Sequence, residues 1–146
     1  MKLFTKAAFA MFIVLILMPG HHALASADGP AHKIVIQVST DDARSQTIAL
    51  NNAVNLQKAV GQDNVAIEIV AFGPGLGLLT STSKQAERVS SLALQDITFS
   101  ACGNTMKKVQ RKTGAMPTLL EGVGVVQAGV LRIMELQEQG YAYVRP

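Results

Sequence analysis

Short apolar runs alternate with longer amphipathic segments along most of the chain. The β-branched runs at residues 33–39, 64–73 and 96–101 predict three strands, and weaker runs at 122–129 and 141–146 predict two more. Apolar residues recur at helical spacing in the segments between them, which predicts helices over residues 40–61, 83–95, 104–114 and 128–140. Residues 74–82 are expected to form a loop with room for one helical turn.

The alternation of strands and helices favours βαβ crossovers. It predicts a single α/β domain over residues 33–146, with a mostly parallel five-stranded sheet and helices on both faces. The predicted helix ends agree with this reading. Asp41 or Asp42 can cap the first helix, Gly61 can end it, and Gly140 can end the last helix.

Two polar residues interrupt the predicted strands. Gln37 and Glu68 lie in the middle of the first and second strands. A buried Glu68 would carry a large desolvation cost if helices of this chain sealed both faces of the sheet. We therefore expect one of three arrangements. One face of the sheet is partly open, another subunit meets the sheet there, or Glu68 reaches water near a strand end.

The first 25 residues have the pattern of a secretory signal peptide. Lys2 and Lys6 precede an unbroken apolar run of 12 residues at 7–18, which is shorter than the roughly 20 residues needed to cross a bilayer. Small residues permit cleavage after Ala25 or after Ala27. We expect an exported protein, in a bacterial periplasm, with a flexible leader at 26–32 and no stable membrane insertion after cleavage.

Export changes the charge balance. The full chain has 13 basic and 10 acidic residues, and removal of Lys2 and Lys6 leaves 11 basic residues. The mature chain would be nearly neutral. It would therefore lack the concentrated basic surface that phosphate binding needs, and we expect no nucleic acid partner.

Several chemistries have no suitable residues in the predicted domain. His21 and His22 lie in the signal segment, and His32 comes just before the first strand, so neither a Ser-His-Asp unit nor a zinc cluster is expected. The "GPGLG" at residues 73–77 lacks the Gly-Lys-Ser/Thr ending of a P-loop and the spacing of a dinucleotide-binding turn. We therefore expect no metal and no cofactor.

Cys102 is the one cysteine of the chain, and it lies between the end of the third predicted strand and the start of a basic helix. Helix N-terminal N–H groups and nearby lysines favour a thiolate, and parallel sheets place their sites at the carboxyl ends of strands. The alternative is a small buried core residue. If Cys102 is reactive, the residues expected around its pocket are Gly73, Gly75, Asn104, Lys107 and Lys108.

Four motifs, in their order and spacing, resemble the DsrE/DsrF-like family, which includes the YchN-like proteins. They are "KIVIQVS", "VAIEIVAFGPGLGLL", "FSACGNTM" and "AGVLRIMELQEQGYAYVRP". The resemblance implies a three-layer α/β/α domain with a five-stranded parallel sheet, and homo- or hetero-oligomers that include trimers and hexamers. In the sulfur-relay members a single cysteine accepts sulfur as a persulfide, and Cys102 falls at the position that resembles it.

Three functions remain open at this stage. The first is a sulfur carrier, at most sulfurtransferase-like, that uses Cys102 together with a donor or acceptor protein. The second is a non-catalytic oligomeric binding module, in which the thiol is structural. The third is a redox partner that forms mixed disulfides with an external cysteine.

Overall fold

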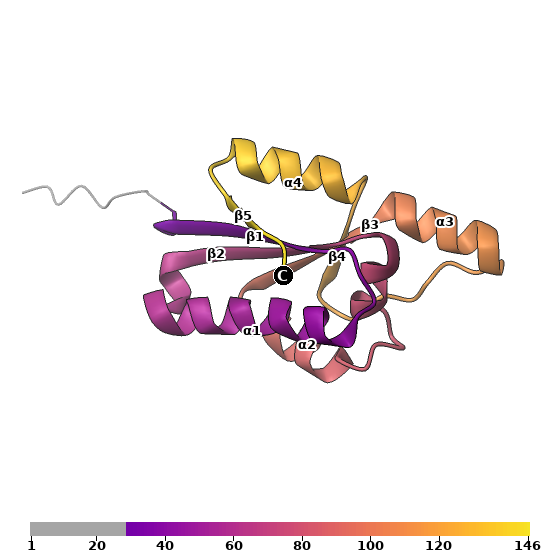
Figure 1. The fold of residues 1–146 in the computed structure, drawn as a ribbon, viewed down its shortest axis with the longest axis horizontal. Coiled ribbons are helices and arrows are strands. Elements are labelled where there is room, and N and C mark those ends of the chain that lie inside the picture. Colours follow the sequence, from indigo (N-terminus) through magenta and orange to yellow (C-terminus); the bar gives the residue numbers. More distant parts are fainter. Residues whose placement is uncertain (1–28) are drawn as a thin grey trace, which may run out of the picture.

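The computed structural model describes residues 29–146, and its centre is one parallel sheet (Figure 1). The five strands lie in the order β4-β3-β2-β1-β5, and every neighbouring pair is parallel. Their bounds are β1 His32–Val38, β2 Val65–Ala71, β3 Ile97–Cys102, β4 Val123–Val126 and β5 Ala142–Val144. The predicted five-stranded parallel α/β fold is therefore confirmed.

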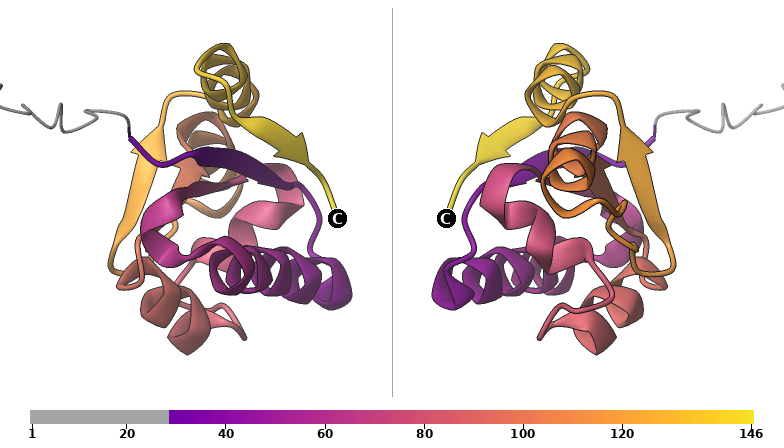
Figure 2. Two further views of the ribbon diagram at one scale, coloured as in Figure 1. Left: turned by 90° about the vertical axis from the view of Figure 1, so that its left-hand side faces the viewer. Right: turned by 90° about the vertical axis from the view of Figure 1, so that its right-hand side faces the viewer.

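Helices cover the two faces of the sheet unequally. Helices α1 (Ala43–Val60) and α2 (Ala86–Ala93) lie on one face and α4 (Gly129–Glu138) lies on the other (Figures 1 and 2). Helix α3 (Gly103–Thr113) extends away from the carboxyl end of the sheet (Figure 1). Two short 3-10 helices complete the domain, η1 (Gln62–Asn64) and η2 (Gly73–Leu79).

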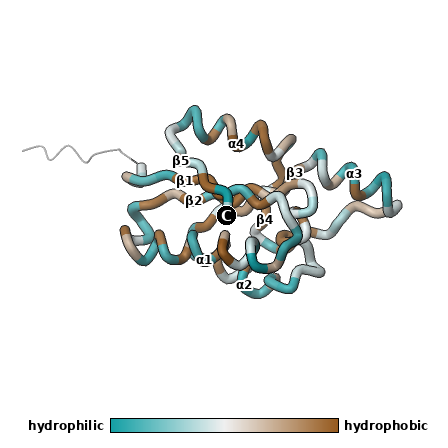
Figure 3. Tube along the Cα trace, in the orientation of Figure 1, coloured by the Kyte–Doolittle hydropathy of each residue, from teal (hydrophilic) through white to brown (hydrophobic). Residues whose placement is uncertain are grey.

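The core divides in the same unequal way. On the α1 and α2 side, a large cluster centres on fully buried side chains such as Leu50, Ile69 and Phe99. On the α4 side, Val35 and Val70 meet only Ile133 and Leu136 in a small cluster of buried residues. Figure 3 shows the hydrophobic stretches along the strands and hydrophilic stretches along the outer helices. Most of the apolar burial therefore lies on one side of the sheet.

Local sequence explains the ends of α1. Asp42 is the N-cap, and its Oδ2 accepts a hydrogen bond of 2.7 Å from the Ser45 N–H. Gly61 ends the helix with a φ of 92°, which a residue with a side chain rarely adopts. The cap and the stop expected from sequence are both present.

The segment after β2 differs from the predicted loop. Residues Gly73–Leu79 form the 3-10 helix η2, in which Leu76, Leu78 and Leu79 are buried. This helix can approach the end of β1 because Gly75 has no side chain, and a Cβ there would overlap the carbonyl oxygen of Val38. Helix α2 is also shorter than the predicted 83–95, since it begins only at Ala86 and ends at Ala93.

The remaining expectations concern the signal peptide and leader, a membrane-spanning helix and a metal site. The signal peptide at 1–25 and the leader up to residue 28 lie outside the described residues. Among residues 29–146, no helix has the length and apolar character needed to cross a bilayer. In the same range, no group of three His, Cys, Asp or Glu side chains is arranged to hold a metal ion.

Candidate functional site

Cys102 lies at a junction between secondary-structure elements. It is both the last residue of β3 and the N-cap of α3, and it pairs with Val126 across the sheet. The residue is only 5% exposed. The thiol is therefore held at the carboxyl end of a central region of the sheet, with little direct contact with solvent.

The N-terminus of a second helix comes to the same place. The link from β4 to α4 passes directly beside the start of α3, because the Asn104 N–H donates a hydrogen bond of 3.2 Å to the carbonyl of Gln127. Gly103 faces the carbonyl of Val126, which lies 3.0 Å from the position of a Cβ on that glycine. Two residues after Gln127, Gly129 begins α4. The thiol thus lies between the N-termini of α3 and α4.

This placement changes the acidity of the thiol. Burial alone raises the pKa of Cys102, because it disfavours the charged thiolate. Hydrogen bonds from the Thr105 side chain and from the N–H groups of Thr105, Gly129 and Asn104 outweigh burial and leave the pKa of Cys102 below its usual value. Hydrogen-bond donors at the N-termini of α3 and α4 therefore favour the thiolate.

Thr105 connects the site to the loop after β2. Its Oγ1 accepts a hydrogen bond of 3.0 Å from the Gly73 N–H, and its side chain and N–H also face the Cys102 sulfur. Thr105 was not among the predicted site residues. The sequence did contain a signal for Thr105. It is a hydroxyl residue three positions after the N-cap Cys102, and the N–H at that position of a helix points back toward the cap.

The predicted pocket residues do not gather around the thiol. Gly73 lies beside the site through Thr105, and it also lines a surface cavity of about 470 Å³ between η2 and α3. Gly75 is buried against β1. Asn104, Lys107 and Lys108 are exposed along α3, and of these three only Asn104, through its backbone N–H, contributes to the lowered pKa of Cys102. None of five surface cavities in the described part of the chain is lined by Cys102.

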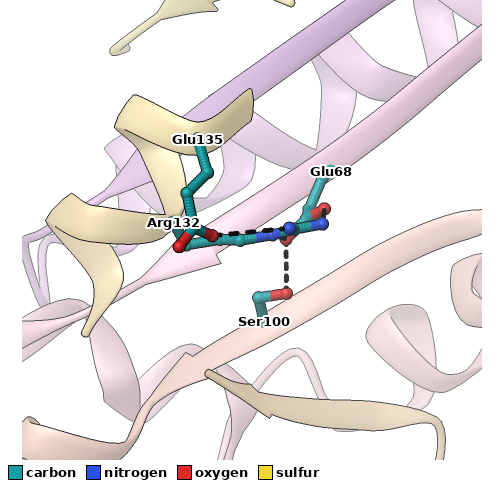
Figure 4. Close-up of polar contacts among 4 residues, drawn as sticks. All are labelled: Glu68, Ser100, Arg132 and Glu135. Atoms are coloured by element: carbon teal, nitrogen blue, oxygen red, sulfur yellow. Dashed lines mark hydrogen bonds and ion pairs between the residues drawn. The ribbon is translucent and has the colours of Figure 1, made fainter. Parts of the chain in front are cut away.

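A partly buried ion pair joins helix α4 to the sheet (Figure 4). Arg132 of α4 reaches Glu68 of β2 with two hydrogen bonds, from Nε to Oε1 at 2.8 Å and from Nη2 to Oε2 at 2.7 Å. The Ser100 hydroxyl donates a third, at 2.6 Å, to Oε1. Glu135 adds a longer contact of 3.7 Å to Arg132.

This arrangement corrects the expectations for Glu68. The residue lies in the middle of β2 and is only 3% exposed, so it does not reach water at a strand end. Its charge is balanced within the chain by Arg132, a partner 64 positions away that the local pattern could not identify. Gln37 is also satisfied internally, because its Oε1 accepts a hydrogen bond of 2.8 Å from the Tyr143 hydroxyl.

Comparison with known proteins identifies a matching family and a similar solved structure. A model of the DsrE/DsrF-like family matches residues 32–146. The solved structure of MTH1491 from Methanobacterium thermoautotrophicum, described as a protein of unknown function, is 34% identical with a TM-score of 0.71. The similarity covers 79% of this chain and 99% of that one. No curated protein matches the chain.

Proposed function

Because the chain belongs to the DsrE/DsrF-like family, which is associated with sulfur relay, we propose that it is a single-cysteine sulfur carrier. Cys102 is the acceptor in this proposal. The observation that carries it is the convergence of N–H donors from α3 and α4 on one sulfur, which favours the nucleophilic thiolate. No second cysteine is available in the chain, so the sulfur must be carried as a persulfide.

The chemistry needs no external oxidant or reductant. The Cys102 thiolate attacks the outer sulfur of a persulfide or thiosulfate donor, the sulfur–sulfur bond of the donor breaks, and a thiolate or sulfite leaves with the electron pair. In the second step an acceptor thiolate attacks the outer sulfur of the Cys102 persulfide, and the Cys102 thiolate leaves. Both steps are exchanges at sulfur, in which the leaving thiolate is favoured by a low pKa.

Sulfur uptake by the purified protein tests this proposal. After incubation with thiosulfate, polysulfide or a loaded sulfurtransferase, the intact mass should rise by one sulfur atom per chain. The Cys102→Ser variant should show no gain. A wild-type protein that takes up no sulfur from any of these donors would overturn the proposal.

The burial of the thiol favours a second candidate, a non-catalytic oligomeric binding module. Cys102 is 5% exposed and lines none of the five cavities described above, as a structural cysteine would. Alkylation of the native protein separates the two candidates. If iodoacetamide modifies Cys102 at the rate of global unfolding, the binding module is favoured. If modification is faster than unfolding, the carrier is favoured.

We also propose that the protein forms a homo-oligomer, a trimer or a hexamer. Helix α4 supports this proposal, since Val130 and Met134 are 65% and 49% exposed and Leu131 is also exposed on the same helix. Apolar side chains gathered on one exposed helix are typical of interaction surfaces. Sedimentation equilibrium measures the mass directly, and a monomer at all concentrations would contradict the proposal.

The location of the carrier follows from its first residues. We propose that the chain is exported and meets its sulfur donor outside the cytoplasm, on the basis of the signal-peptide pattern at 1–25. Fractionation of cells that express the full chain should recover a shortened protein in the periplasm. Recovery of the full-length chain in the cytoplasm would contradict export.

A further inference from the structure

Helix α4 has a weak apolar attachment to the sheet. Its buried residues Ile133 and Leu136 meet Val35 and Val70, with Phe72 and Tyr141 partly buried beside them. Apolar contact is not directional, so a cluster this small does not by itself set where α4 lies along the sheet. The start of this helix nevertheless lies beside the Cys102 site, because the Gln127 carbonyl, two residues before Gly129, accepts a hydrogen bond of 3.2 Å from the Asn104 N–H.

The Arg132–Glu68 ion pair is directional, and it can set where α4 lies along the sheet. Arg132 has a planar guanidinium group, and its two hydrogen bonds to the two oxygens of Glu68 fix both the distance and the orientation of the groups. Glu68 is itself immobilised, because it is buried in the sheet and accepts the Ser100 hydroxyl hydrogen bond. Burial of an ion pair contributes little net stability, so the main effect of this pair is on the geometry of α4.

The ion pair and the thiol are linked through two rigid elements. On β3, Ser100 precedes Cys102 by two residues, so both side chains lie on the same face of the sheet. On α4, Arg132 follows Gly129 by three residues, which is about one helical turn. Strand β3 and helix α4 are thus joined at two points. Ser100 and Arg132 both bond Glu68, and Asn104, two residues after Cys102, bonds Gln127, two residues before Gly129.

We infer that Glu68, Arg132 and Ser100 are positioning residues, which hold the N-terminus of α4 against the Cys102 sulfur. This inference rests on the proposed function, since it assigns a purpose to the geometry of that site. None of the three is a catalytic residue, because none touches the sulfur. Their effect is transmitted by the first turn of α4 and the last residues of β3.

The test is the pH dependence of Cys102 alkylation, which reports the thiolate directly. The double variant Glu68→Met/Arg132→Met replaces the ion pair by apolar side chains, an exchange that often preserves stability. We expect the titration midpoint to move up and alkylation at neutral pH to fall about three- to tenfold, because the hydrogen bond to the thiolate is weakened but not lost. Ser100→Ala should give a smaller change in the same direction.

A matched control separates positioning from general loosening. Leu50→Ala removes buried volume beneath the opposite face of the sheet and should lower the melting temperature without moving the midpoint. An unchanged midpoint in the double variant and in Ser100→Ala would overturn the inference, as would an equal shift in Leu50→Ala. If the double variant does not fold, Ser100→Ala and Arg132→Lys decide the matter, since each removes only part of the cluster.

The outcome is independent of the test of sulfur uptake. A wild-type protein that accepts sulfur while the double variant keeps its midpoint would refute the positioning role and leave the carrier function intact. A wild-type protein that accepts no sulfur would refute the carrier function, whatever the midpoints are.

Discussion

The sulfur of Cys102 is surrounded by hydrogen-bond donors from both helices that begin beside it. Thr105 and Asn104 belong to α3, and Gly129 belongs to α4. A buried cysteine in apolar surroundings would have a raised pKa, whereas here hydrogen bonding lowers the pKa despite burial. The acidity of this single thiol should therefore depend on the donors around it.

The lowered pKa of Cys102 links stability to pH. A folded-state pKa below the unfolded value adds stability that is fully present above the unfolded pKa, about 8.5, and is lost as pH falls through the folded value. The free energy of unfolding of the wild type, relative to Cys102→Ser, should therefore rise as pH increases toward the ordinary thiol pKa of about 8.5, and level off above it. Urea denaturation under reducing conditions measures it. A difference that stays constant over this range would contradict the lowered pKa.

Gly129 should be required for the acidity of the thiol. A Cβ at this position would lie 2.8 Å from Cδ1 and 3.0 Å from Cβ of Phe72, so the Gly129→Ala variant must displace either the ring or the start of α4. We expect the alkylation midpoint of Cys102 to move up. Gly77→Ala is the matched control, because a Cβ there meets nothing within 4 Å. Equal midpoints in the two variants would count against the role of α4.

At the scale of elements, the segment after β2 depends on one close approach. Gly75 lets η2 pass against the end of β1, and any side chain there would overlap the Val38 backbone. Gly75→Ala should therefore destabilise the protein by about 1–3 kcal/mol, the usual cost of overpacking. Chemical denaturation measures the loss, again with Gly77→Ala as the control. A Gly75→Ala protein as stable as this control would show that η2 can move away freely.

The elements that could be predicted from sequence are those with a local pattern. The strands at 33–39 and 64–73 have long β-branched runs, and the capping Asp42 and the terminating Gly61 mark α1 at both ends. The 3-10 helix at Gly73–Leu79 was predicted only as a loop with room for one helical turn, because its glycines and proline are equally typical of a loop.

The candidate site was less predictable than the fold. The position of Cys102 at a strand-to-helix junction could be anticipated from the change in pattern around it. The contribution of Gly129 and the pairing of Arg132 with Glu68 could not, because they bring together residues far apart in the chain. Such contacts depend on the crossover that carries α4 from β4, at one edge of the sheet, to β5 at the other.

At the scale of the whole molecule, the two faces of the sheet have different characters. One face holds the large core beneath α1 and α2, and the other holds the small cluster beneath α4, the ion pair and the thiol. Helix α4, which carries exposed apolar side chains, lies on this second side of the molecule (Figure 1). The proposed assembly would therefore cover the side of the sheet that carries Cys102.

A charge on α4 should weaken that assembly. Met134 is half exposed, so Met134→Lys should change the free energy of unfolding of the monomer by no more than about 0.5 kcal/mol. It should nevertheless shift the sedimentation equilibrium toward smaller species. Leu94→Lys, at the end of α2 on the opposite side, is the matched control, because Leu94 is 87% exposed. An equal effect of both variants would argue against an interface on α4.

The pH dependence of sulfur loading tests directly whether the Cys102 thiolate accepts sulfur. Intact mass after a fixed time with a persulfide or thiosulfate donor gives the loaded fraction at each pH, and iodoacetamide gives the titration midpoint of Cys102 under the same conditions. We expect one added sulfur per chain, absent in Cys102→Ser, with a loading midpoint equal to the alkylation midpoint and below that of an ordinary thiol. Loading that is absent at every pH, or that persists in Cys102→Ser, would contradict this expectation.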